Sequence, residues 1–360
     1  MNRAERRRAA RARRGRDSAA GGSDATFTEA KARHEAGDLT GAETLYRRLL
    51  SSNPRHADGL HLLGLLHYQA GRAPDAVASI RKAIAEDPGA AAYRANLGRI
   101  LLETERYRDA AEQYDEATRL APDNAEAYAN RAVALNALGR ADEAEAALRK
   151  ALALSPENPE LLFAFGQFLA GQRRFAEAIS LFERVARLVP DSADARIAWG
   201  NAAMEAGDFD AAGRAFGEAA SLRPEDIELR IDAGIALSRA DRAEAAIPVL
   251  EAALSAQPDN VRAAYSLGLT YKNAYRMAEA RDRFDAVLLR QPDHALAMIE
   301  LAGCLQRENR VDEAMALYGK AFRLDRRHFA NIVKTMTMIP HGRFSADYRR
   351  MRKMLETAGR

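Results

Sequence analysis

The chain has 360 residues, of which 48% are hydrophobic and 29% charged, and a formal net charge of +3 at pH 7. No apolar run approaches the about 18 residues that a membrane-spanning helix needs, the N-terminus lacks the apolar core of a secretory signal, and the single cysteine, Cys304, allows no intrachain disulfide. These features exclude a transmembrane or disulfide-stabilised protein and predict a cytoplasmic location.

Residues 1–22 form a basic segment with eight arginines against Glu5 and Asp17 and almost no apolar face. This composition is typical of a solvated arm, either disordered or helical. Because clustered arginines attract phosphate, the alternatives are binding to an anionic membrane surface, to nucleic acid or to ribosomes. An organellar transit peptide is a further alternative. Nucleic acid is disfavoured, because the segment has no aromatic residue to stack on bases.

Residues 23–328 repeat with a period of 34 residues, so that eight of the 12 prolines recur at that interval. With this proline at position 32, nine units begin at Ser23, Ala57, Ala91, Ala125, Pro159, Ala193, Ile227, Val261 and Ala295. In every unit position 8 is small, position 20 is alanine, and position 24 is large and apolar. Such a period is typical of stacked helical pairs, in which small residues let two helices approach closely.

The turn residues divide each unit into two helices. Position 15 carries Gly37, Gly71, Gly139, Gly207 and Asn309 in five units, and these residue types accept the left-handed conformation that ends a helix. The proline at position 32 ends the second helix, because proline cannot continue the hydrogen-bond ladder. Each unit is therefore predicted to be helix A, a tight turn and helix B.

Residues 329–360 are predicted to cap the last unit with two helices, separated by a break at Pro340-His341-Gly342. Each helix has one apolar face, and Ser345 can begin the second. These faces consist of Phe329, Ile332, Val333 and Met336 in the first helix and of Tyr348, Met351 and Leu355 in the second. The basic residues 349, 350, 352 and 353 would face outward, and the alternative is that this helix binds a partner or a surface.

Residues 23–328 resemble the tetratricopeptide repeat family. The resemblance rests on the dipeptides at positions 7 and 8 and on the alanine, the apolar residue and the proline that follow at positions 20, 24 and 32. The dipeptides are Leu63-Gly64, Leu97-Gly98, Phe165-Gly166, Trp199-Gly200 and Leu267-Gly268. The array is similar to bacterial ones found beside O-GlcNAc-transferase-like and sulfotransferase domains, although residues 329–360 are too few to form such a domain. The resemblance implies an all-α, right-handed superhelix (an α-solenoid) of nine helix-turn-helix repeats with C-terminal capping helices. It also implies a concave groove, lined by the A helices, that binds a peptide or protein, and no catalysis.

In this family the groove is lined mainly by positions 2, 5, 6, 9, 12 and 13. Asn96 and Asn130, both at position 6, resemble the asparagine ladder of the O-linked N-acetylglucosamine transferase repeats. A carboxamide both donates and accepts, so a row of them can pair with the main chain of an extended peptide. Nearby polar candidates are Arg99, Asn136, Gln167 and Asn201. The alternative is a set of ordinary exposed helix residues, since no other unit has asparagine at position 6.

Position 5 becomes apolar in the later units, with Phe163, Ile197, Ile231 and Tyr265. Such a row can receive a partner helix or an apolar peptide, or it can pack between adjacent A helices. Position 5 never carries lysine, which argues against the carboxylate clamp that binds chaperone tails in this family.

The sequence holds no enzyme signature, because its seven histidines have no metal-ligand spacing and it has neither a phosphate loop nor a nucleophile elbow. We therefore expect a non-catalytic interaction scaffold or adaptor, with no cofactor or metal. One alternative is an accessory subunit that delivers substrate to a separate glycosyl- or sulfo-transferase. Another is an adaptor to nucleic acid or an anionic membrane through residues 1–22. No pattern identifies the partner or the oligomeric state.

Overall fold

The computed structural model describes residues 24–338 and 348–359, and every regular element in these two ranges is a helix. Three predicted features lie outside the described residues: the basic arm 1–22, the break at Pro340-His341-Gly342 and the helix start at Ser345. The chain forms two compact units, Met1–Ala164 and Phe165–Arg360, and their boundary falls inside helix α9 (Pro159–Gly171).

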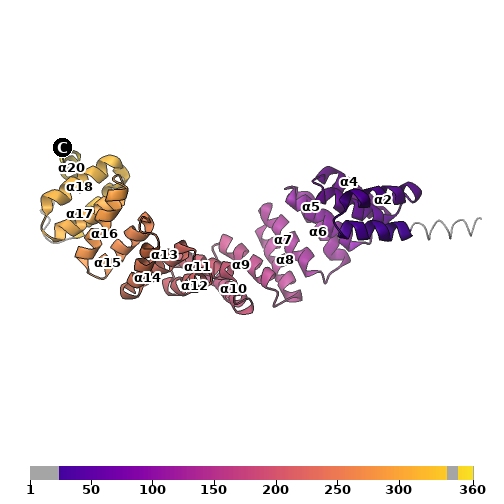
Figure 1. Ribbon diagram of the computed structural model, residues 1–360, viewed down its shortest axis with the longest axis horizontal. Helices are drawn as coiled ribbons and strands as arrows, with labels where there is room; N and C mark the ends of the chain where they lie inside the picture. The colour runs from indigo at the N-terminus through magenta and orange to yellow at the C-terminus, as the bar shows by residue number, and fades with distance from the viewer. Residues whose placement is uncertain (1–23, 339–347, 360) are drawn as a thin grey trace, which may run out of the picture. The chain divides into compact units, whose positions relative to one another are not determined.

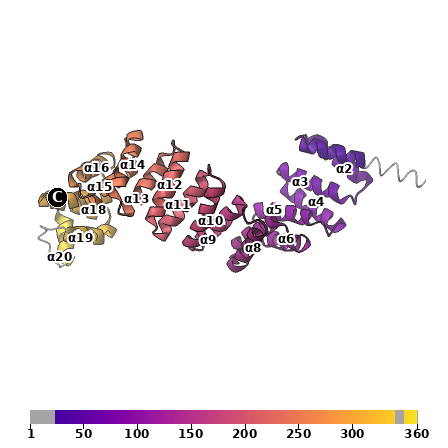
Figure 2. The same ribbon diagram turned by 90° about the horizontal axis from the view of Figure 1, so that it is seen from below.

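The first unit consists of helices that pack side by side in chain order (Figures 1 and 2). Residues 24–35 are helical and belong to the first repeat. The elements that follow, up to α9, are α2 (Leu39–Ser52), α3 (Ala57–Gln69), α4 (Ala73–Glu86), α5 (Ala91–Glu103), α6 (Tyr107–Leu120), α7 (Ala125–Ala137) and α8 (Ala141–Leu154).

The second unit continues the same alternation of A and B helices and adds two helices at its end. Its A helices after α9 are α11 (Ala193–Ala206), α13 (Ile227–Arg239), α15 (Val261–Asn273) and α17 (Ala295–Arg307). Its B helices are α10 (Phe175–Leu188), α12 (Phe209–Leu222), α14 (Ala243–Ala256), α16 (Met277–Arg290) and α18 (Val311–Leu324). The terminal elements are η1 (Arg326–His328), α19 (Phe329–Met338) and α20 (Tyr348–Thr357). The predicted all-α repeat fold is confirmed within each unit.

Each A helix packs on its B helix through the columns that the sequence pattern identified. The nine alanines at position 20 are buried, and so are the nine large residues at position 24. A Cβ atom added at Gly64 would lie 2.5 Å from Ile80 Cγ1, and one at Gly200 would lie 2.7 Å from Phe216 Cε1. Position 8 is therefore small because the side chain at position 24 occupies that space.

The turn between the two helices is the same in all nine units. Position 15 has a positive φ not only at the four glycines and Asn309 but also at four residues that the sequence pattern did not single out. These are Glu105 (59°), Arg173 (59°), Asp241 (61°) and Tyr275 (61°). The backbone N–H of position 16 donates a hydrogen bond to the carbonyl of position 11. Examples are Arg72 to the His67 carbonyl and Arg106 to the Leu101 carbonyl, both at 2.8 Å. This bond closes a Schellman turn, which requires the left-handed residue whatever its side chain.

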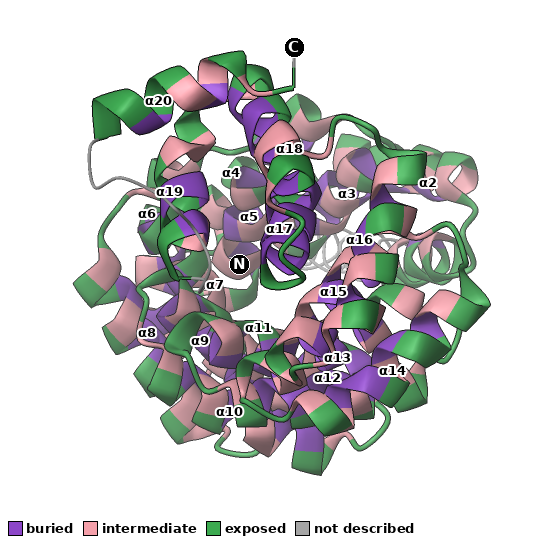
Figure 3. Cartoon of the chain, turned by 90° about the vertical axis from the view of Figure 1, so that its left-hand side faces the viewer, coloured by how far each residue is buried: buried purple, intermediate pink, exposed green. Residues whose placement is uncertain are grey.

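The last repeat is covered by the two terminal helices, as the view onto the C-terminal end shows (Figure 3). Helix α19 lies against α17 and buries Ile332, Val333 and Met336. Phe329, the fourth residue expected on that face, is half-buried. The fully buried Gln306 donates from Nε2 to the Met336 carbonyl at 3.0 Å. Helix α20 lies against α18, where the Arg323 guanidinium donates to the Ala358 carbonyl at 2.7 Å.

Candidate binding surface

Three of the predicted groove residues meet in one small pocket of the first unit. Asn96 and Arg99 on α5 and Asn130 on α7 line a space of about 160 Å³, together with Tyr114 on α6. We call it the α5–α7 pocket; its other lining residues are Ala92, Ala95, Asn124, Glu126 and Ala127. The repeat places Asn96 and Asn130 at the same position of adjacent A helices, so one ligand can contact both.

The Asn96 side chain is oriented by the preceding repeat. Its Nδ2 lies 3.0 Å from His61 Nε2, and the His61 ring stacks on Tyr93 with centroids 4.4 Å apart. Burial lowers the pKa of His61 to about 4, so the imidazole is neutral and can accept a hydrogen bond from the amide. The carbonyl oxygen of Asn96 is then left to accept from a ligand.

Arg99 adds a positive charge beside the two amides. Its guanidinium lies 5.6 Å from the centroid of the Tyr68 ring and 3.5 Å from the Glu103 carboxylate. The side chain is 41% exposed, and a long ion pair at this exposure holds it weakly. Arg99 can therefore move when a ligand approaches.

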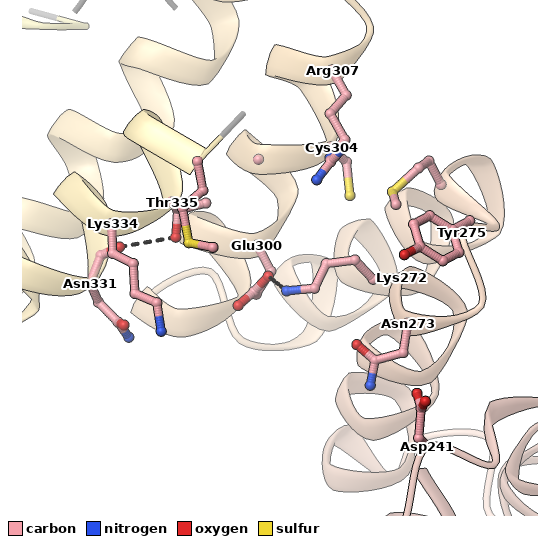
Figure 4. Close-up of a pocket in the computed structure, with 13 residues that line it drawn as sticks. Asp241, Lys272, Asn273, Tyr275, Glu300, Cys304, Arg307, Asn331, Lys334 and Thr335 are labelled. Carbon is pink, nitrogen blue, oxygen red and sulfur yellow. Dashed lines mark hydrogen bonds and ion pairs between the residues drawn. The ribbon is translucent and has the colours of Figure 1, made fainter. Parts of the chain in front are cut away.

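A larger pocket lies in the second unit, beside α19 (Figure 4). Its volume is about 450 Å³, and its lining includes Tyr275, Lys272, Glu300, Arg307 and Lys334. Lys272 pairs with Glu300, as the dashed line in Figure 4 marks. None of the predicted groove residues lines it. The signal was nonetheless in the sequence, because Phe329 continues the register as a tenth position 1 and so places Lys334 at position 6.

Two tetratricopeptide repeat models match the chain, one over residues 27–91 and 96–159, and the other over residues 135–199, 169–212, 203–270 and 273–333. The chain belongs to the tetratricopeptide repeat (TPR) family. TPR proteins bind protein or peptide partners, so the chain is a protein-interaction scaffold, and the fold is typically non-catalytic. A comparison with curated proteins gives no match.

Solved structures share the fold of this TPR chain at low sequence identity. PilW, a widely conserved type IV pilus biogenesis factor, is 20% identical, with a TM-score of 0.51 and coverage of 58% of this chain and 96% of its own. Pseudomonas aeruginosa PilF is 23% identical, with a TM-score of 0.50 and coverage of 60% and 97%. YrrB, described as a TPR protein with an unusual peptide-binding site, is 24% identical, with a TM-score of 0.45 and coverage of 52% and 96%.

The apolar row at position 5 of the TPR units needs a correction. Ile231 is fully buried in the core of the second unit, so it offers no surface to a ligand and leaves the candidate site. Tyr265 is half-buried, with its ring 5.9 Å from that of Phe284 and 5.1 Å from that of His294. At these two positions the alternative, packing inside the array, describes the structure. The Tyr265 ring packs on Phe284 of its own repeat and on His294, which caps α17, and burying such side chains is favourable.

The remaining candidates of the TPR array are not gathered into either pocket. Phe163 on α9 and Ile197 on α11 are half-buried. Asn136, Gln167 and Asn201 are exposed on α7, α9 and α11, and they line neither the α5–α7 pocket nor the pocket beside α19. They therefore remain isolated polar positions.

Cys304 lines the pocket beside α19 but is only 1% exposed, as expected of a small apolar residue. Burial raises the pKa of its thiol to about 11, so the reactive thiolate is scarce at neutral pH. Within residues 24–338 and 348–359, no three His, Cys, Asp or Glu side chains are grouped to hold a metal ion. In the same ranges no helix is both long and apolar enough to cross a bilayer.

Proposed function

We propose that this TPR chain is a non-catalytic adaptor that binds an extended peptide segment of a partner protein on the A helices of its first unit. The observation that carries the proposal is the convergence of Asn96, Arg99 and Asn130 on the α5–α7 pocket. Carboxamides in successive repeats pair with main-chain groups and demand no particular side chain. The ligand is therefore recognised mainly through its backbone.

The chemistry of the pocket agrees with a neutral backbone ligand. Asn96 is half-buried and already oriented by His61, so binding loses little rotamer entropy at that side chain. Glu126 at the same pocket and Glu103 beside Arg99 offset the positive charge of the guanidinium. An uncharged peptide group avoids the desolvation that a charged side chain would suffer there.

The test is a selection of random dodecapeptides on the full chain, followed by affinity measurements on the selected peptides. Replacing both Asn96 and Asn130 by alanine removes two pairing groups, each worth about 0.5–1.5 kcal/mol. We expect roughly a fivefold to hundredfold weaker affinity, with unchanged helicity because neither residue is in a packing column. Asn136→Ala is the matched control, since Asn136 is exposed on the same α7 and lies outside the pocket.

Wild-type affinity in the double variant, combined with loss of binding in Ile197→Asp, would move the ligand to the later repeats and contradict the proposal. Copurification with the full chain identifies the natural partner. Recovery of a glycosyl- or sulfo-transferase would instead favour the accessory-subunit alternative.

A further inference from the structure

The hydroxyl of Tyr114 is buried and has no hydrogen-bond partner. The residue is 1% exposed and lines the α5–α7 pocket. A Cβ added at Gly98 would come within 2.9 Å of its Cε2 and Cζ atoms, so α5 packs directly on the ring. A buried hydroxyl without a partner is destabilising, so its presence calls for a reason, and a ligand that completes the hydrogen bonding is one.

The other two tyrosines at position 24 do have partners. Tyr46 Oη lies 3.5 Å from His34 Nδ1, and Tyr318 donates to Gln306 Oε1 at 3.4 Å. His34 and Gln306 both occupy position 12 of the same repeat as their tyrosine. In the third repeat position 12 is Leu102, which can neither donate nor accept. The sequence therefore keeps the tyrosine at this position and omits its internal partner.

We propose that the Tyr114 hydroxyl donates a hydrogen bond to a main-chain carbonyl oxygen of the bound peptide where it passes between Asn96 and Asn130. This inference rests on the proposed function and adds a third main-chain contact to it. Arg99 lines the same pocket, and its half-exposed, weakly held side chain can move when the ligand enters. Burial raises the pKa of the Tyr114 phenol, so the group stays a donor throughout the physiological range.

A carbonyl oxygen suits this position better than a carboxylate. Glu126 already lines the pocket with a carboxylate. Arg99 is the only cationic residue that lines this pocket, and it pairs with Glu103. A second anion would therefore be buried without full compensation. The space of about 160 Å³ admits one peptide group or a small side chain.

The experiment titrates the full chain, labelled with ¹⁵N-asparagine, with N-methylacetamide as a mimic of one peptide group and with acetate as a mimic of a carboxylate. We expect N-methylacetamide to shift the side-chain amide signals of Asn96 and Asn130. Tyr114→Phe should weaken this response roughly threefold to tenfold, the effect of one ordinary hydrogen bond. Its melting temperature should equal or exceed that of the wild type, because the variant loses an unpaired buried hydroxyl.

Tyr318→Phe is the matched control, since it removes the same hydroxyl from a repeat in which Gln306 accepts from it. It should lower the melting temperature and leave the response to N-methylacetamide unchanged. A Tyr114→Phe protein that melts as low as Tyr318→Phe, or binds N-methylacetamide as the wild type does, would overturn the role of Tyr114 alone. A response to acetate without one to N-methylacetamide would also overturn it. If neither probe shifts the side-chain amide signals of Asn96 and Asn130, the proposed function is overturned as well.

Discussion

Glu105 shows how the repeat imposes a conformation that its side chain disfavours. Its φ is 59°, in the left-handed region that the glycines at position 15 of other units also occupy, with φ between 75° and 82°. The left-handed region costs a non-glycine residue roughly 1–2 kcal/mol. Because the Arg106 N–H bonds back to the Leu101 carbonyl, the turn keeps this geometry in spite of that cost.

Glu105→Gly is therefore expected to stabilise the chain by about 0.5–1 kcal/mol, since the relief of backbone strain exceeds the entropy that glycine loses on folding. Urea denaturation of the full chain measures the change. Gly139→Ala is the matched control, and it should destabilise by a similar amount. A Cβ atom added at Gly139 meets no atom within 4 Å, so the stability that Gly139→Ala loses comes from the backbone conformation alone. Two variants with the same sign of change would contradict this account.

The terminal helices α19 and α20 cover apolar surface that the last repeat would otherwise expose. Helix α19 lies on α17, and α20 lies on α18, where Met351 and Leu355 are buried. Such atypical end elements are what a stacked array needs, because each repeat has two apolar flanks and the last one has no successor. The first helix of the cap, α19, begins at the position where helix A of a tenth repeat would begin, whereas α20 does not follow the repeat pattern.

Deletion of residues 329–360 should therefore cause self-association of a protein that remains helical. Light scattering coupled to size-exclusion chromatography, with circular dichroism, measures both properties. Deletion of residues 348–360 is the control. It leaves α19 and the bond from Gln306 to the Met336 carbonyl in place and should give weaker association. A monodisperse, equally stable protein lacking residues 329–360 would show that these helices do not cap the array.

Contacts in both compact units join neighbouring helices along the chain rather than distant segments. The free energy of unfolding of such an array is close to the sum of the intrinsic stabilities of its repeats and of the interfaces between adjacent repeats. A local defect should therefore stay local. Trp199 in α11 is suited to a test, because it is 8% exposed and its indole Nε1 is buried without a partner.

Trp199→Ala is expected to cost about 3–5 kcal/mol because it leaves a large cavity. Trp199→Phe should cost much less, about 1 kcal/mol, because it keeps an aromatic ring and removes an unpaired N–H. Hydrogen exchange measured by mass spectrometry should show that the backbone amides of α10 to α13 exchange faster in Trp199→Ala than in the wild type. The amides of the other helices should change little. Uniform acceleration along the chain would contradict nearest-neighbour coupling.

The helical framework was predictable from the sequence because its causes are local and recur every 34 residues. Alanine at position 20, the small residue at position 8 and the proline at position 32 act within one unit. Accordingly, eight A helices from α3 to α17 begin at the predicted position 1. Glu105, Arg173, Asp241 and Tyr275, unlike Asn309, were missed because their left-handed conformation comes from the turn's hydrogen bonds and not from their own preference.

Which residues of the candidate binding surface are exposed or unpaired, in contrast, was decided only by the packing of neighbouring helices. Ile231 and Asn96 lie at adjacent positions of the pattern, yet the first is buried and the second lines the α5–α7 pocket. The unpaired hydroxyl of Tyr114 and the pocket wall formed by α19 likewise depend on which side chains meet across an interface. A periodic pattern places side chains along each helix, but burial and pairing are set by the neighbouring helix, whose residues differ from unit to unit.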